Sequence, residues 1–174
     1  MRHVMIDLET MGTTPNSAIV SIGAVIFDPR FNKVTKETFY KRLAWKTQGR
    51  YLCPDTKKWW SQQSPETKKG LRGKVQLEDA LEALSDFLPQ DCKVWGNGAG
   101  FDIVMLEDAY RECLIDIPWK FWNVLDCRTV KAIFESKRGG LNDNFTGVAH
   151  NALDDAIHQA KWVTMMWNKL GLKK

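Results

Sequence analysis

The first forty residues alternate between apolar runs and breaks in a way that predicts three strands. Apolar residues dominate positions 4–10 and return, rich in Ile and Val, at positions 18–27, with Gly12 and Pro15 breaking the chain between them. Positions 33–40 alternate apolar and polar residues, which is typical of a more exposed strand. We therefore expect a meander of three antiparallel strands at the start of the fold.

Beyond residue 50 the pattern changes to helical spacing with two short apolar strands in between. Helices are predicted over residues 55–63, 65–71, 77–88, 101–114, 129–134 and 152–167, and strands over residues 92–95 and 124–125. Strands that alternate with helices pair in parallel. The expected fold is therefore α/β, with a mixed sheet whose first three strands are antiparallel and whose later strands are parallel, flanked by helices.

Length and composition agree with one globular domain over residues 1–174. The chain is 44% hydrophobic and 26% charged, which is enough to build a sizeable core. Its four cysteines have no paired spacing, so neither a zinc site nor a disulfide framework is expected. The N-terminus has no signal-like run and no segment reaches membrane-span length, so we expect a cytoplasmic protein without a membrane partner.

The first predicted strand carries two acids one residue apart. Side chains alternate along a strand, so Asp7 and Glu9 point to one face while Val4, Ile6 and Leu8 point to the other. Two such charges roughly 7 Å apart repel by about 2 kcal/mol at an effective dielectric near 20. A divalent cation such as Mg²⁺ or Mn²⁺ would offset that cost. The alternative is a strand that runs out into a solvated turn.

The charge of the chain is unevenly distributed. Residues 41–74 hold ten Lys and Arg against two acids, a net of +8, while the whole chain is only +4, so the remainder sums to −4. Trp45, Tyr51, Trp59 and Trp60 are interleaved among these positive charges. Basic groups follow phosphates and aromatic faces stack on bases, which favours a surface for single-stranded nucleic acid. The alternatives are a solvated Lys-rich face and tryptophans that belong to the core.

Three features of the second half bear on chemistry. Asp102 follows a Gly-rich break at the start of a predicted helix, where an acid serves either as an N-cap or as a metal ligand from the end of a neighbouring strand. The loop-like residues 137–144 precede His150 and are a candidate lid. On the last predicted helix, Asp154, Asp155 and His158 lie outside the apolar stripe, and we expect His158 to be solvated.

Together these acids and the histidine form three ordered motifs: Asp7-Leu8-Glu9, Asp102 after Asn97-Gly98-Ala99-Gly100-Phe101, and His150 followed five positions later by Asp155. They resemble the exonuclease motifs of the DEDDh family, which includes ribonuclease T, oligoribonuclease and polymerase proofreading subunits on a ribonuclease H-like fold. The first motif, continued to Gly12, together with Trp59-Trp60 and Gln63-Ser64, is most similar to small phage and prophage exonucleases related to mycobacterial-type exoribonucleases.

The resemblance implies a metal-dependent 3′→5′ exonuclease that acts on 3′ ends of single-stranded DNA or RNA and releases nucleoside 5′-monophosphates. It implies that two Mg²⁺ or Mn²⁺ ions are held by four acids and that His150 is the general base. It also implies a terminal-nucleotide pocket at Thr10 and Met11. The implied metal ligands are Asp7, Glu9, Asp102 and Asp155.

Two departures, two alternatives and one open expectation accompany this interpretation. Gly100 stands where many relatives carry a larger residue, and Asp154 duplicates the acid beside Asp155. An endonuclease of the ribonuclease H type is an alternative, although His150 argues against it. A non-catalytic nucleic-acid-binding module is another. Relatives such as ribonuclease T act as dimers, so a homodimer is an open expectation.

Overall fold

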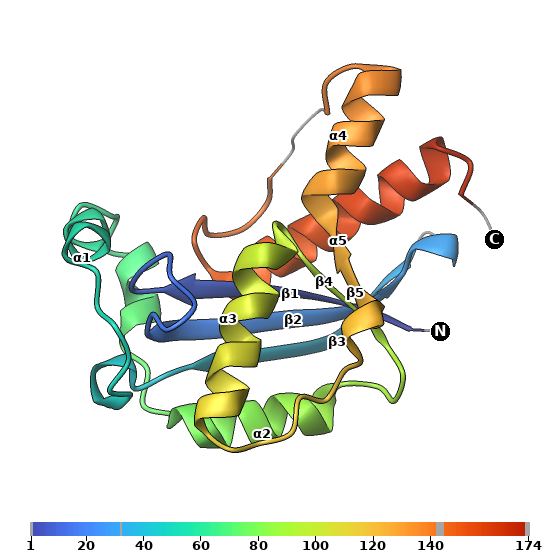
Figure 1. The fold of residues 1–174 in the computed structure, drawn as a ribbon. Helices are drawn as coiled ribbons and strands as arrows, with labels where there is room; N and C mark the ends of the chain where they lie inside the picture. Colours follow the sequence, from blue (N-terminus) through green and yellow to red (C-terminus); the bar gives the residue numbers. More distant parts are fainter. Residues whose placement is uncertain (1, 32, 142–144, 173–174) are drawn as a thin grey trace.

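The computed structural model describes residues 2–31, 33–141 and 145–172, and its centre is a five-stranded mixed sheet (Figure 1). The strand order is β3-β2-β1-β4-β5, with β1–β2 and β2–β3 antiparallel and β1–β4 and β4–β5 parallel. This confirms the predicted mixed sheet. The strands are β1 His3–Thr10, β2 Ile19–Asp28, β3 Lys33–Arg42, β4 Lys93–Gly96 and β5 Val124–Asp126.

Helices cover both faces of the sheet and give it three layers. The α-helices are α1 Pro54–Ser61, α2 Leu77–Phe87, α3 Ala99–Glu112, α4 Cys127–Arg138 and α5 Ala152–Lys169. On one face α2 and α3 pack on Val4, Ile6 and Leu8. On the other face α5 and α4 pack on Met5 and Phe27. The alternation predicted for the first strand is confirmed, and that strand is buried on both sides.

Several helix boundaries differ from the sequence prediction for local reasons. The helix expected at 101 begins at Ala99, because Gly98 adopts a left-handed φ of 100° and turns the chain directly out of β4. The helix expected at 129 begins at Cys127, because the Asp126 side chain caps it by accepting a hydrogen bond from the Thr129 N–H. The segment expected to be helical over 65–71 is a short 3₁₀ turn, Thr67–Leu71.

The candidate lid also differs in part. Residues 137 and 138 were expected in a loop but belong to the last turn of α4, which ends at Gly139 with a positive φ of 80°. Residues 142–144 of the candidate lid lie outside the described residues. Among the described helices none is both long enough and apolar enough to cross a membrane.

A single glycine sets how closely α5 approaches the sheet. Gly23 lies on β2 directly opposite Asp7 on β1. A Cβ atom at Gly23 would come within 2.2 Å of the carbonyl carbon of Ala152, the first residue of α5. The backbone of α5 therefore rests on the backbone of β2 next to Asp7. One helical turn further along, α5 brings Asp155 to the same place.

We predict that Gly23→Ala pushes the start of α5 away from the sheet. The added methyl group would overlap backbone atoms of α5, which have no room to move. The substitution should therefore lower the free energy of unfolding by about 1–3 kcal/mol. Gly70→Ala is the matched control, because a Cβ at Gly70 meets nothing within 4 Å. Urea denaturation of both variants checks this. Equal stability of the two would contradict the close approach.

Candidate active site

The motif residues meet in one cleft of about 580 Å³ at the carboxyl ends of the central strands. Its lining combines residues from β1, α1, α3, α4 and the start of α5. The motif residues that line the cleft are Asp7, Glu9, Asp102, His150 and Asp155. The structure therefore brings together all five residues that the three sequence motifs singled out.

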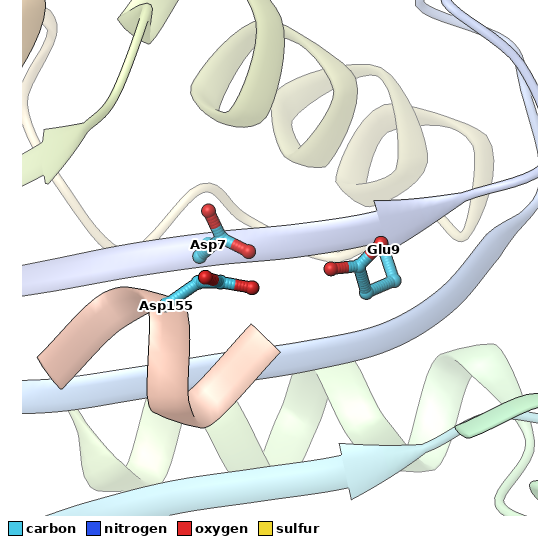
Figure 2. Close-up of side chains that lie close together, drawn as sticks. All are labelled: Asp7, Glu9 and Asp155. Carbon is cyan, nitrogen blue, oxygen red and sulfur yellow. The ribbon is translucent and has the colours of Figure 1, made fainter. Parts of the chain in front are cut away.

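Asp7, Glu9 and Asp155 form the centre of this cleft. Each offers a carboxylate oxygen, and these three oxygens lie within 4.8 Å of one another. Figure 2 shows Asp155 on α5 facing the two acids on β1. Carboxylate oxygens converging at this spacing are the ligand type that Mg²⁺ and Mn²⁺ prefer, so these residues fit a divalent cation.

Asp102 reaches the same cleft from the opposite face of β1. Its Oδ1 accepts a hydrogen bond from the Leu8 N–H at 3.2 Å. β1 pairs with β4 only as far as Met5 and Trp95. Beyond that point the Leu8 N–H donates to the Asp102 carboxylate instead of to a backbone carbonyl of β4. The N-cap interpretation of Asp102 is wrong, because the N-cap of α3 is Gly98.

The electrostatics of the cleft are dominated by burial of the acids. Burial, reinforced by neighbouring carboxylates, raises the pKa of Asp7 well above its usual range and that of Glu9 to about 8. Burial likewise raises the pKa of Asp102 to about 7 and that of Asp155 to about 6. Raised pKa values clustered in one cleft are typical of functional sites. Without cations, the negative form of Glu9 is therefore disfavoured near neutral pH.

Gln159 belongs to the site although the sequence analysis missed it. Its Nε2 donates a 2.7 Å hydrogen bond to Asp7 Oδ1, which opposes the rise in the pKa of Asp7. Its Oε1 is buried and has no hydrogen-bond partner among the described residues. Gln159 lies four residues after Asp155, so it shares the site-facing side of α5. This spacing of four residues was the signal from which the sequence could have identified Gln159 as part of the site.

His158 is not on the solvated side of α5 as expected. It is only 8% exposed and its ring lies 4.9 Å from Phe145 and 4.6 Å from Trp162, centroid to centroid. The expectation was wrong because it considered only the stripe that packs on the sheet. Phe145, in the segment before α5, and Trp162, on α5 itself, cover the side of the helix on which His158 lies.

His150 occupies the mouth of the cleft. It is exposed, has a left-handed φ of 62°, and directly precedes Asn151, whose side chain caps α5 by accepting from the Leu153 and Asp154 N–H groups. Its ring meets the Trp59 ring edge-on with centroids 4.8 Å apart. A hydrogen bond from the His150 backbone opposes the rise in the pKa of Asp155 that burial causes. His150 is thus held next to the acids by its own backbone.

The two adjacent acids of α5 have different environments. Asp154 Oδ2 accepts a 2.9 Å hydrogen bond from the Val148 N–H, and the Asp154 carboxyl would contact any Cβ placed at Gly147. Asp155 faces Asp7 and Glu9. The geometry therefore favours Asp155 over Asp154 as the fourth acid.

The four residues expected to contact substrate divide into two pairs. Thr10 and Trp59 line the cleft. Met11 and Trp60 are 1% and 2% exposed and pack together with Ala18. The Trp60 Nε1–H donates to the Thr10 carbonyl oxygen at 2.9 Å. We therefore assign Met11 and Trp60 to packing beneath the cleft, in line with the core alternative for the tryptophans.

Comparison with known proteins decides the family. The model of the 3'-5' exoribonuclease Rv2179c-like domain matches residues 2–167. The chain belongs to this family. The exonuclease is also 27% identical to the exodeoxyribonuclease of Enterobacteria phage T4 over 204 aligned residues, which cover 95% of this chain and 88% of the relative. The resemblance to DEDDh exonucleases is confirmed, and the protein is a hydrolytic 3′→5′ exonuclease.

Solved structures agree with the exonuclease in fold. Cell-death related nuclease 4 (CRN-4) superposes with a TM-score of 0.71 at 13% identity, covering 97% of this chain and 64% of that chain. The nuclease domain of 3'hExo, a DEDDh family member bound to rAMP, gives 0.65 at 16% identity over 97% and 92% of the two chains. E. coli Exonuclease I with a dA16 oligonucleotide gives 0.69 at 17% identity over 98% and 43%. The ribonuclease H-like fold is confirmed.

The two neighbouring acids of α5 provide a matched test of the site. We predict that Mn²⁺ at a hundred times its Kd stabilises the wild type by about 2.7 kcal/mol and that Asp155→Asn loses most of this gain. Asp154→Asn should keep it, because the amide oxygen still accepts from the Val148 N–H. Thermal unfolding with and without Mn²⁺ measures both. Equal shifts in the two variants would count against the assignment of Asp155.

Proposed function

We propose that the exonuclease removes nucleotides one at a time from the 3′ end of single-stranded DNA or RNA and releases nucleoside 5′-monophosphates. In this proposal two divalent cations, Mg²⁺ or Mn²⁺, are held by four acids. The proposed ligands are Asp7, Glu9, Asp102 and Asp155. The observation that carries the proposal is the convergence of these four acids, with raised pKa values, in one open cleft beside His150.

The choice of cations rests on the donor set and on a relative in fold. All four ligands are carboxylates, which favour hard cations over zinc. A solved structure of S. pombe Pop2p in its Mg²⁺- and Mn²⁺-bound form superposes with a TM-score of 0.64. When bound, such a pair of ions lowers the pKa of the attacking water and stabilises the leaving oxygen.

His150 is the proposed general base. The reaction forms a bond between a water oxygen and phosphorus and breaks the bond between phosphorus and the 3′ oxygen of the preceding nucleotide, which takes up a proton. A neutral imidazole accepts the proton that the attacking water loses. His150 is exposed and lines the cleft, which is the position that this role requires.

Thr10 and Trp59 are proposed to hold the terminal nucleotide. Trp59 is 38% exposed, so one part of its ring is available for stacking on a base, which is worth about 1–3 kcal/mol. Around it Lys57 and Lys58 are exposed on α1 and are placed to follow phosphates. Arg50, counted with the same basic segment, is buried against Asp108 and Glu112 and does not contribute.

Both DNA and RNA remain in the proposal because the similar proteins differ. The matched family model is described as an exoribonuclease and the T4 relative as an exodeoxyribonuclease. The oligonucleotide bound to E. coli Exonuclease I in the superposed structure is dA16, which supports a single-stranded substrate. The homodimer stays a prediction that light scattering would measure.

The decisive experiment is digestion of 5′-labelled single-stranded and double-stranded DNA and RNA of matched sequence. With Mn²⁺ we expect a ladder that shortens one nucleotide at a time, fastest on single strands, and we expect EDTA to stop it. A 3′-terminal phosphate serves as the control, because it should slow cleavage at that end. Internal cuts from the first time point would instead favour the ribonuclease H-type endonuclease.

We predict that His150→Ala lowers the single-turnover rate by about two to four orders of magnitude, because the attacking water loses its proton acceptor. Stabilisation by Mn²⁺ should survive, since the four acids remain. Lys161→Ala is the control, because Lys161 lies on the exposed side of α5. His158, the other histidine of this region, is buried, so its substitution would also disturb packing. A near-normal rate in His150→Ala would remove His150 from the mechanism.

A further inference from the structure

A second cavity of about 480 Å³ opens beside the active-site cleft, between the turn that joins β4 to α3 and the first turn of α4. Three of its lining residues, Asn97, Phe101 and Arg128, also line the cleft, so the two spaces are continuous. Both volumes fall within the range of about 300–1,000 Å³ that is usual for ligand sites. The second cavity completes its lining with Gly98 and Gly100.

We propose that this cavity binds the nucleotide on the 5′ side of the scissile bond, with Arg128 on its 5′-phosphate and its base against Phe101. The inference rests on the proposed function, because it assumes that the scissile phosphate lies at the four acids. It adds a recognition site for the part of the substrate that becomes the leaving group. Neither the sequence motifs nor the four acids assign this role to any residue.

Arg128 is held in place by the turn that it covers. Its Nη2 donates a 3.0 Å hydrogen bond to the Asn97 carbonyl oxygen, the one hydrogen bond of this side chain within the described ranges. A Cβ at Gly98 would lie 3.5 Å from the guanidinium carbon, so the group lies directly over that glycine. A guanidinium has five N–H donors in a fixed plane. The remaining donors are oriented by the turn and suit a phosphate.

Gly100 leaves the space that a base would fill. It is the second residue of α3, and a Cβ built there meets no heavy atom within 4 Å. A larger side chain at this position would extend into the cavity. Next to it Phe101 is only partly buried and lines the cavity, so its ring offers a surface on which a base can stack. Gly100 thus acquires a role in the size of the site.

Arg128 belongs to the lining that the cleft and the second cavity share. Its positive charge attracts phosphate at this place. The acids that face Arg128 are Asp102, which bonds Leu8, and Asp126, which bonds the Ala99 and Thr129 N–H groups.

The test compares two substrates that differ only in the 5′ neighbour. One is a single-stranded oligonucleotide, and the other is the p-nitrophenyl ester of thymidine 5′-monophosphate, in which p-nitrophenol replaces that neighbour. Arg128→Ala should reduce kcat/KM for the oligonucleotide about 10- to 100-fold more than for the ester, the effect expected for a charged hydrogen bond to phosphate. The salt dependence of oligonucleotide binding should also weaken, by about 0.7 in the logarithmic slope.

A second variant and a control protect the test against a folding defect. Gly100→Leu should fold at least as stably as the wild type, because Leu favours a helix over Gly, yet it should show the same selective loss on the oligonucleotide. Arg138→Ala, at the far end of α4, should change neither substrate.

Three outcomes would overturn the inference. Equal losses on both substrates would make Arg128 a support of the cleft, and no loss on either would leave it without a role. A wild type that cleaves neither substrate in Mn²⁺ would remove the proposed function and this inference with it.

Discussion

Mutual repulsion among buried and partly buried carboxylates is the constraint on which the rest of this structure depends. At 4.8 Å, two unit charges repel by about 3 kcal/mol at an effective dielectric of 20. Carboxylate oxygens of Asp7, Glu9 and Asp155 lie within this distance of one another, with Asp102 close behind β1. In the metal-free state burial, together with the neighbouring carboxylates, raises the pKa of Asp7 well above its usual range and that of Glu9 to about 8, so that protons replace part of the missing positive charge. Cations at the same place would remove the need for those protons.

The scaffold around the acids keeps them together despite this cost. β1 is buried on both faces, so Asp7 and Glu9 cannot turn away without exposing Met5 or Ile6. Gly23 lets α5 rest on β2, which fixes Asp155 opposite them. Asp102 is fixed by its bond to the backbone of β1, and Gln159 holds one oxygen of Asp7. Each acid thus has a separate anchor, and the packing of the core opposes their repulsion.

The sequence predicted the parts of this arrangement that follow from short-range pattern. Strand alternation placed Asp7 and Glu9 on one face, and the three ordered motifs pointed to five residues that the structure brings into one cleft. What it missed depends on contacts between distant segments. Met11 and Trp60 are buried because α1 folds back over the end of β1, where Trp60 bonds the Thr10 carbonyl. His158 is buried because Phe145 and Trp162 enclose it. The packing of α1 on β1 and the contact of Phe145 with His158 have no periodic signature, whereas Trp162 lies one helical turn after His158 on α5.

The central claim is that the acids of the metal-free site hold protons that a divalent cation displaces. Titration calorimetry with Mn²⁺ between pH 6 and 8, repeated in buffers of different ionisation enthalpy, counts the protons released on binding. Because the pKa of Glu9 is raised to about 8 and that of Asp102 to about 7, release should be largest near pH 6 and should decline as the pH rises through 8. Binding of Mn²⁺ with no proton release across this range would contradict the account.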